Sequence, residues 1–111
     1  MEKILINTHE KISIINIDDI NYLEAKGAYT IFSLQNGIKV KASKNLNYFN
    51  SHIFNPKMLK IERGKVVNLN NLKEICKEKL YCKIVFIDNY DLKISKSVSQ
   101  RLLKMLEEHF V

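Results

Sequence analysis

The chain has 111 residues, enough for one domain with a modest core of its own. Hydrophobic residues make up 46% of it and charged residues of both signs 27%, a composition that excludes an intrinsically disordered chain. Lysine and arginine number 18 against 12 aspartates and glutamates, which gives a formal net charge of +6. Such a domain is attracted to polyanions, so nucleic acid is one candidate partner; the alternative is that the charge serves only solubility.

The sequence contains no signal for a membrane or for export. No apolar run approaches the roughly 20 residues that a membrane-spanning helix needs. The start, MEKILINTHEK, has two acidic residues and no small-residue cleavage site, unlike a signal peptide. We therefore expect a cytoplasmic protein without membrane contact, in which Cys76 and Cys82 are reduced.

The first apolar residues recur at the two-residue spacing of β-strands. KILINT (residues 3–8) and KISIIN (residues 11–16) predict a hairpin with its turn at residues 8–10. IDDI (residues 17–20) predicts a local turn, because aspartate side chains hydrogen-bond their own backbone.

Three further strands are predicted from NYLEAK (residues 21–26), YTIFSL (residues 29–34) and IKVKA (residues 38–42). A Gly-Ala step separates the first two strands. Asn36-Gly37 separates the second from the third and is the strongest turn signal in the chain, because this pair tolerates positive φ.

The apolar spacing then changes from that of a strand to that of a helix. SKNLNYFNSHIF (residues 43–54) predicts a short internal helix, with Ser43 as its N-cap and Asn55-Pro56 as its end. MLKIE (residues 58–62) predicts a short strand after it.

The last part of the chain predicts more strands and a final helix. LKEICKE (residues 72–78) and LYCKIVFI (residues 80–87) form a predicted hairpin, and LKIS (residues 92–95) a last strand. Residues 97–109 predict a C-terminal helix with one apolar stripe. The stripe consists of Val98, Leu102, Leu103, Leu106 and Phe110. The whole pattern predicts a single, mainly β domain, residues 1–111, with one short internal helix and a C-terminal helix.

No enzyme motif is complete in the sequence. Gly64-Lys65 invites comparison with a phosphate-binding loop, but Leu59 stands where that motif needs glycine and Val66 where it needs serine or threonine. No nucleophile, base and oxyanion donor come together either. We therefore expect a protein that is not an enzyme.

Metal and redox sites are also incomplete. The three histidines are scattered, and the spacing from Cys76 to Cys82 does not suit a zinc knuckle. The two cysteines flank a predicted hairpin turn, so they form either a redox-sensitive pair across it or two small core residues. Asp18-Asp19 has no third ligand nearby and predicts a turn. We expect no metal and no cofactor.

Arg63, one of only two arginines, lies where an extended strand changes into a turn in KIERGKVVNLNNL. A guanidinium presents a fork that matches the O6 and N7 acceptors of guanine. Gly64 leaves its backbone N–H open to a phosphate, while Val66-Val67 can anchor the segment and Asn68 can bond the turn's backbone. The alternative is a surface arginine whose stem packs on a neighbour.

Three other turns or helix starts combine a basic residue with serine or glycine. The positive charge, the serine hydroxyls and the open backbone N–H groups suit a phosphate. Each of the three also fits an ordinary cap or turn with a solvated lysine. The three are Lys26-Gly27 with Tyr29, Ser43-Lys44, and Ser95-Lys96-Ser97.

Taken in order, these segments resemble the LytTR family of bacterial DNA-binding domains. The resemblance rests on DDINYLEAKGAY, ASKNLNYF, FNPKMLKIERGKVVNLNNLKEI and LKISKSVSQRLLKML, and it runs from about Ile4 to Leu106. The element R..VVN is its most specific part. Members of the family serve mostly as output domains of two-component response regulators.

The resemblance implies an elongated arrangement of small antiparallel β-sheets whose loops enter successive major grooves of double-stranded DNA, commonly over paired direct repeats. It implies that such a domain pairs on DNA and follows a receiver domain in a longer chain. The implied base-reading residues are Lys26, Tyr29, Arg63 and Lys96. The implied phosphate contacts are Ser43, Lys44, Gly64, Lys65, Ser95 and Ser97.

Two positions depart from the family pattern. Gly64 stands where serine is common, so a backbone N–H replaces a hydroxyl contact. Lys96 stands where arginine is common, and a lysine lacks the planar fork that discriminates guanine. Two other functions remain open: a protein-interaction module that modulates a partner LytTR regulator, and an RNA-binding β domain, for which no strand face of stacked aromatics is evident.

Overall fold

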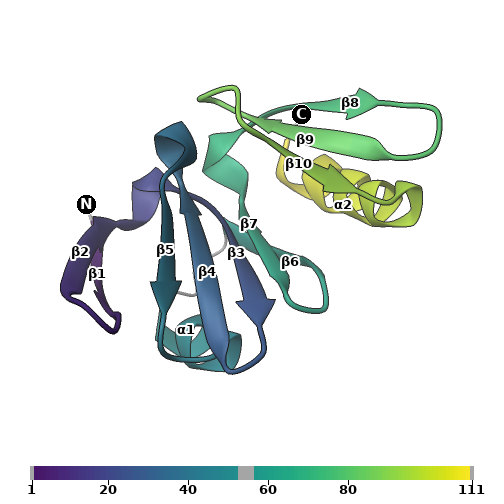
Figure 1. Cartoon of the computed structure of the whole chain (residues 1–111). Coiled ribbons are helices and arrows are strands. Elements are labelled where there is room, and N and C mark those ends of the chain that lie inside the picture. The colour runs from purple at the N-terminus through teal and green to yellow at the C-terminus, as the bar shows by residue number, and fades with distance from the viewer. Residues whose placement is uncertain (1, 53–56, 111) are drawn as a thin grey trace. The chain divides into compact units, whose positions relative to one another are not determined.

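The computed structural model describes residues 2–52 and 57–110, and about half of them lie in β-strands joined by short turns (Figure 1). The fold is mainly β, with several small antiparallel sheets and two helices, one of them C-terminal, as predicted. The chain divides into two compact units, Met1–Asn71 and Leu72–Val111.

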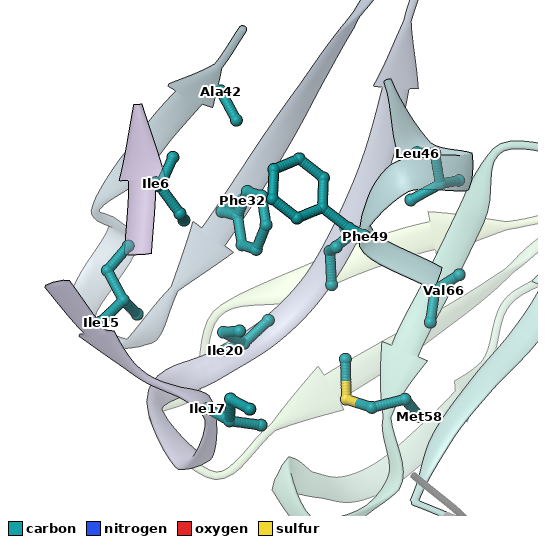
Figure 2. Close-up of a cluster of buried hydrophobic side chains, with 11 residues drawn as sticks. Ile6, Ile15, Ile17, Ile20, Phe32, Ala42, Leu46, Phe49, Met58 and Val66 are labelled. Atoms are coloured by element: carbon teal, nitrogen blue, oxygen red, sulfur yellow. The ribbon is translucent and has the colours of Figure 1, made fainter. Parts of the chain in front are cut away.

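The first unit combines a two-stranded hairpin, a five-stranded sheet and one helix. The hairpin pairs β1 (Lys3–Asn7) with β2 (Ile12–Asn16), and the sheet has the antiparallel order β5-β4-β3-β7-β6. The helix α1 (Leu46–His52) packs against one face of the sheet (Figure 2). The sheet strands are β3 (Ile20–Lys26), β4 (Tyr29–Leu34), β5 (Lys39–Ala42), β6 (Met58–Glu62) and β7 (Lys65–Asn68).

The core of this unit lies between the helix and the sheet (Figure 2). Phe32 of β4 is fully buried and meets Phe49 of α1 edge to face, with 4.8 Å between the ring centroids. Ile20 and Leu23 both join this core although they are three residues apart, because a bulge between Ile20 and Tyr22 shifts the alternation of β3. Local irregularity therefore adds an extra core side chain to the central strand.

Asparagines fasten the end of β7 to the start of β3. The side-chain amide of Asn68 donates to the carbonyl of Ile20 (2.9 Å), and its oxygen accepts the N–H of Asn70 (3.1 Å). The amide of Asn71 donates to the carbonyl of Asp18 (2.9 Å). Asn68 does bond turn backbone, but in the turn at residues 69–71 that follows β7 and not in the turn of Arg63 and Gly64. The polar cluster after Val67 therefore holds β7 to β3.

The second unit is a three-stranded antiparallel sheet with a helix on one face. Its strands have the order β10-β9-β8, and buried residues such as Ile84 and Leu102 form its core. The elements are β8 (Leu72–Lys77), β9 (Cys82–Phe86), β10 (Asp91–Ile94) and α2 (Lys96–His109).

The predicted N-cap of the internal helix is wrong. The helix α1 begins at Leu46, and the side chain of Asn45 accepts the N–H of Tyr48 (3.0 Å) in the manner of a cap. Ser43 is held elsewhere, because its N–H and its hydroxyl both donate to the carbonyl of Asn7 in β1 (3.0 and 3.2 Å). The predicted end of the helix at Asn55-Pro56 lies outside the described residues.

The apolar stripe predicted for the C-terminal helix also needs correction. Leu103 is 50% exposed and Phe110 56% exposed, so these two do not belong to the buried stripe of α2, whereas Val98 and Leu102 are buried and Leu106 is half-buried.

The two cysteines cannot face each other across the β8–β9 hairpin. Cys82 lies opposite Lys77 in the β8–β9 ladder, and Cys76 lies opposite Lys83. Residues opposite each other share a face of a sheet, and adjacent residues point to different faces. Cys76 and Cys82 therefore point to opposite faces, and a redox pair between them is excluded in this fold.

Candidate functional site

Arg63 lies at the tip of the β6–β7 hairpin. Glu62 pairs with Lys65, so Arg63 and Gly64 form the two-residue turn, and the exposed Arg63 is free of the sheet ladder. Gly64 has φ +81°, in the left-handed region that favours glycine. Behind the turn, the buried Val66 anchors β7, as predicted.

The turn of Arg63 and Gly64 is hydrogen-bonded to the neighbouring β3–β4 hairpin. The carbonyl of Gly64 accepts the N–H of Ala25 (2.8 Å), and a Cβ on Gly64 would lie 3.4 Å from the Cβ of Ala25. A side chain at this position therefore meets backbone strain, while its distance from Ala25 is that of an ordinary van der Waals contact.

We expect Gly64→Ala to lower the free energy of unfolding by about 1–2 kcal/mol, because alanine is strained at positive φ. Urea denaturation followed by circular dichroism measures the change. Gly27→Ala is the matched control: Gly27 has φ +60°, but a Cβ added there would meet nothing within 4 Å, so this variant reports backbone strain alone. An unchanged stability of Gly64→Ala would contradict the assigned turn.

Arg63 also lines a groove of about 350 Å³ between its hairpin and α1. Asn47 and Asn50, three residues apart on α1, line the same groove, as does Asn45 just before the helix. Sequence reasoning singled out none of these asparagines. The available signal was the three-residue spacing of Asn47 and Asn50, which places them on one side of the helix.

The predicted site at Lys26 to Tyr29 is the turn of the β3–β4 hairpin. Lys26 pairs with Tyr29 across the turn, and its ammonium lies 3.8 Å from a carboxylate oxygen of Glu24. The ammonium of Lys41 lies over the Tyr29 ring, 4.3 Å from its centroid, and the centroids of the His9 and Tyr29 rings are 6.5 Å apart. A basic and aromatic cluster thus forms around Tyr29 from three different strands or turns, and neither His9 nor Lys41 was singled out from the sequence.

Lys65 and Ser43 are engaged within the protein. The ammonium of Lys65 lies 3.7 Å from a carboxylate oxygen of Glu24 and 4.0 Å from one of Glu62. The Ser43 hydroxyl donates to Asn7, so a phosphate would have to displace that hydrogen bond. Lys44 is exposed, with its ammonium 5.4 Å from the Tyr48 ring centroid. Unlike Lys65, Lys44 forms no ion pair with a carboxylate of the described residues.

The second unit brings together the predicted residues at the start of α2. Ser95 is the N-cap, and its hydroxyl oxygen accepts the N–H of Val98 (3.2 Å). The hydroxyls of Ser95 and Ser97 lie 3.2 Å apart. The ammonium of Lys96 donates to the carbonyl of Glu78 in the β8–β9 turn. Ser97 and Lys96 are both exposed.

We expect Ser95→Ala to lower the free energy of unfolding by about 1 kcal/mol, because the cap of α2 is lost. Ser97→Ala, two residues further on, is expected to change it by less than about 0.5 kcal/mol, as exposed substitutions usually do. Thermal or urea unfolding of both variants measures the difference. Equal losses would show that Ser95 has no special capping role.

The described part of the chain contains neither a cluster of metal-binding side chains nor a helix that could span a membrane. Across residues 2–52 and 57–110, no group of three or more histidine, cysteine, aspartate or glutamate side chains is placed to hold a metal ion. No helix in the same residues combines the length and the apolar character needed to cross a bilayer.

Comparison with known proteins gives two findings. A family model described as "LytTr DNA-binding domain" matches residues 10–109. A solved structure from Bacillus cereus, named as the LytTr DNA-binding domain of a putative methyl-accepting/DNA response regulator, is similar over 96% of this chain and 97% of that one, with a TM-score of 0.74 and 18% identity. At that identity the likeness speaks for the fold. No curated protein matches the chain.

Proposed function

Because the chain belongs to the LytTR family of DNA-binding domains, we propose that it binds double-stranded DNA sequence-specifically, with loops in successive major grooves. The match to the family model over residues 10–109 is the observation that carries this proposal. In this proposal the protein is a bacterial, cytoplasmic transcription regulator without enzymatic activity, or the output domain of a response regulator that carries a receiver domain. It pairs on DNA at direct repeats.

Arg63 is the proposed principal base reader. Its exposure at a hairpin tip and the rigid attachment of that tip through Gly64 and Ala25 favour this role. A planar guanidinium held on a rigid element can bond both O6 and N7 of a guanine. Lys26, Tyr29 and Lys96 are the further proposed base contacts.

The proposed phosphate contacts differ in the interactions within the protein that each must break before it can bind DNA. Lys44, Ser97 and the N–H of Gly64 need no ion pair to break. Lys65 would have to break its ion pairs with two carboxylates, and these carboxylates are themselves repelled by the DNA phosphates. We therefore propose that Lys65 contributes less to binding. Ser43 and Ser95 would act only if their present hydrogen bonds rearranged.

Selection of bound duplexes from a random library tests the proposal. The expected product is a directly repeated motif that contains guanine. Titrations of duplex DNA, single strands and RNA at two salt concentrations accompany it, and duplex DNA should bind most tightly, with affinity falling as salt rises. Equal affinity for all three polyanions, or no enriched motif, would overturn sequence-specific duplex binding.

A second candidate function is a module that pairs with a partner LytTR regulator. It is favoured by three large aliphatic side chains on the outer face of the β1–β2 hairpin: Leu5 is 56% exposed, Ile12 61% and Ile14 68%. Leu5 and Ile14 lie directly opposite each other in the ladder. Contiguous exposed apolar surface marks protein interfaces. Co-purification with a LytTR regulator that is lost in Ile14→Ser, without any duplex binding by the wild type, would support this function.

A further inference from the structure

The second unit contains a cleft of about 410 Å³ between its sheet and α2, which the proposed DNA contacts leave unexplained. Ile75, Lys77 and Cys82 line it from the sheet, and Lys96, Gln100 and Leu103 line it from the helix. The volume falls in the range of small-molecule pockets.

The body of the cleft is apolar and partly open to water. In the β8–β9 ladder Ile75 lies opposite Ile84 and Lys77 opposite Cys82, so these side chains share the face that α2 covers. Leu103 is 50% exposed, although the adjacent Leu102 is fully buried in the core. An apolar chain laid between Ile75 and Leu103 would remove both from water, which is favourable.

One end of the cleft is cationic. Lys96 and Lys77 both line it, and none of the described residues that line it is acidic. The ammonium of Lys96 is held at the carbonyl of Glu78, and the Ser99 hydroxyl donates to the carbonyl of Lys96 (2.7 Å), which fixes the backbone of this first helical turn. The ammonium of Lys96 can turn from a neutral carbonyl to an anion, which it binds more strongly.

We propose that this cleft binds a monomeric, medium-chain alkyl carboxylate. The alkyl chain lies against Ile75, Cys82 and Leu103, and the carboxylate meets Lys77 and Lys96. The second part of the inference rests on the proposed function: because Lys96 is also a proposed DNA contact, the ligand competes with DNA for it. Such coupling is reciprocal, so DNA weakens ligand binding by the same factor.

Titration of the whole chain with decanoate below its micellar concentration tests the site, followed by NMR. Shifts are expected to cluster at Ile75, Cys82, Gln100 and Leu103. Acetate should produce none of them, and 1-decanol should bind about tenfold more weakly, because it lacks the charge. Scattered shifts, or equal affinity for 1-decanol, would overturn the site. Anionic phospholipid vesicles that shift the same residues in place of decanoate would assign the cleft to a membrane surface and overturn the proposal.

Matched variants sharpen this test. Leu103→Glu is expected to weaken decanoate binding more than about tenfold, because it places a carboxylate in the cleft. Leu80→Glu is the control, since Leu80 is 83% exposed and is not part of the cleft lining. Lys77→Gln should weaken binding several-fold, and Lys83→Gln, on the opposite face of the sheet, should not. An unchanged affinity in Leu103→Glu would overturn the site.

DNA titrations with and without decanoate separate the two parts of the inference, ligand binding in the cleft and its competition with DNA. Decanoate is expected to raise the dissociation constant for the selected duplex in the wild type and not in Leu103→Glu. Decanoate binding without any effect on DNA would overturn the coupling. Absence of duplex binding would overturn the proposed function, and the titration without DNA would still decide whether the cleft binds its ligand.

Discussion

Phe32→Ala is expected to lower the free energy of unfolding by about 3–5 kcal/mol, the largest change that any single substitution proposed for this chain produces. Phe32 is fully buried on β4 and packs edge to face against Phe49, at 4.8 Å between centroids (Figure 2). Alanine removes the apolar surface of the ring and leaves a cavity, because the strands on both sides of β4 fix the backbone around it. The aromatic contact with Phe49 is lost as well.

Urea denaturation followed by circular dichroism measures this loss. Because small domains are stable by only about 5–15 kcal/mol, Phe32→Leu provides a second variant that folds, with an expected loss of about 1–2 kcal/mol. Phe110→Ala is the matched control, since Phe110 is 56% exposed and should change stability by less than about 0.5 kcal/mol. Similar losses for Phe32→Ala and Phe110→Ala would contradict the described core.

Arg63→Ala is expected to weaken binding to the selected duplex by about 1–3 kcal/mol, or about 5- to 150-fold, and to relax the preference at one base pair. The physical reason is the loss of two hydrogen bonds from a fork that no other residue at the hairpin tip can replace. Binding to random duplexes should change far less. Polarisation titrations on selected and random duplexes measure both affinities, and circular dichroism checks that the exposed substitution leaves the fold intact.

Lys65→Ala is the comparison that separates base reading from charge. It removes one positive charge from the strand next to the same turn, so it should weaken the selected and random duplexes about evenly. Its salt slope should fall by less than the roughly 0.9 expected for one phosphate contact, because Glu24 and Glu62 already partly offset the charge. Equal losses on both duplexes for Arg63→Ala would remove its role as a base reader.

Local chemistry made much of the fold predictable. The alternation of Ile4 and Ile6 predicts β1, and Asn36-Gly37 predicts the turn between β4 and β5, where both residues have positive φ. Gly64 likewise predicts a turn that presents Arg63. Such features depend on neighbours in the chain, so they can be read without knowledge of the rest of the molecule.

Other features depend on which distant segments pair, and they could not be read in this way. The helix α1 begins at Leu46, so Asn45 caps it and Ser43 instead bonds to β1. Lys65 is ion-paired because register places it opposite Glu24. The lining of the Arg63 groove by asparagines of α1 has the same origin.

The sequence by itself determined the positive charge and the family. It also determined the turns, both helices and most of the strands in order, because backbone preferences and apolar spacing act locally. The strand β7 was not predicted, because its apolar part is only the short step Val66-Val67. Only the tertiary structure decided which charged and polar side chains are already engaged, which face each cysteine takes, and where a groove or cleft opens. These properties follow from strand register and packing between segments far apart in the chain, and a one-residue shift in register would reverse them.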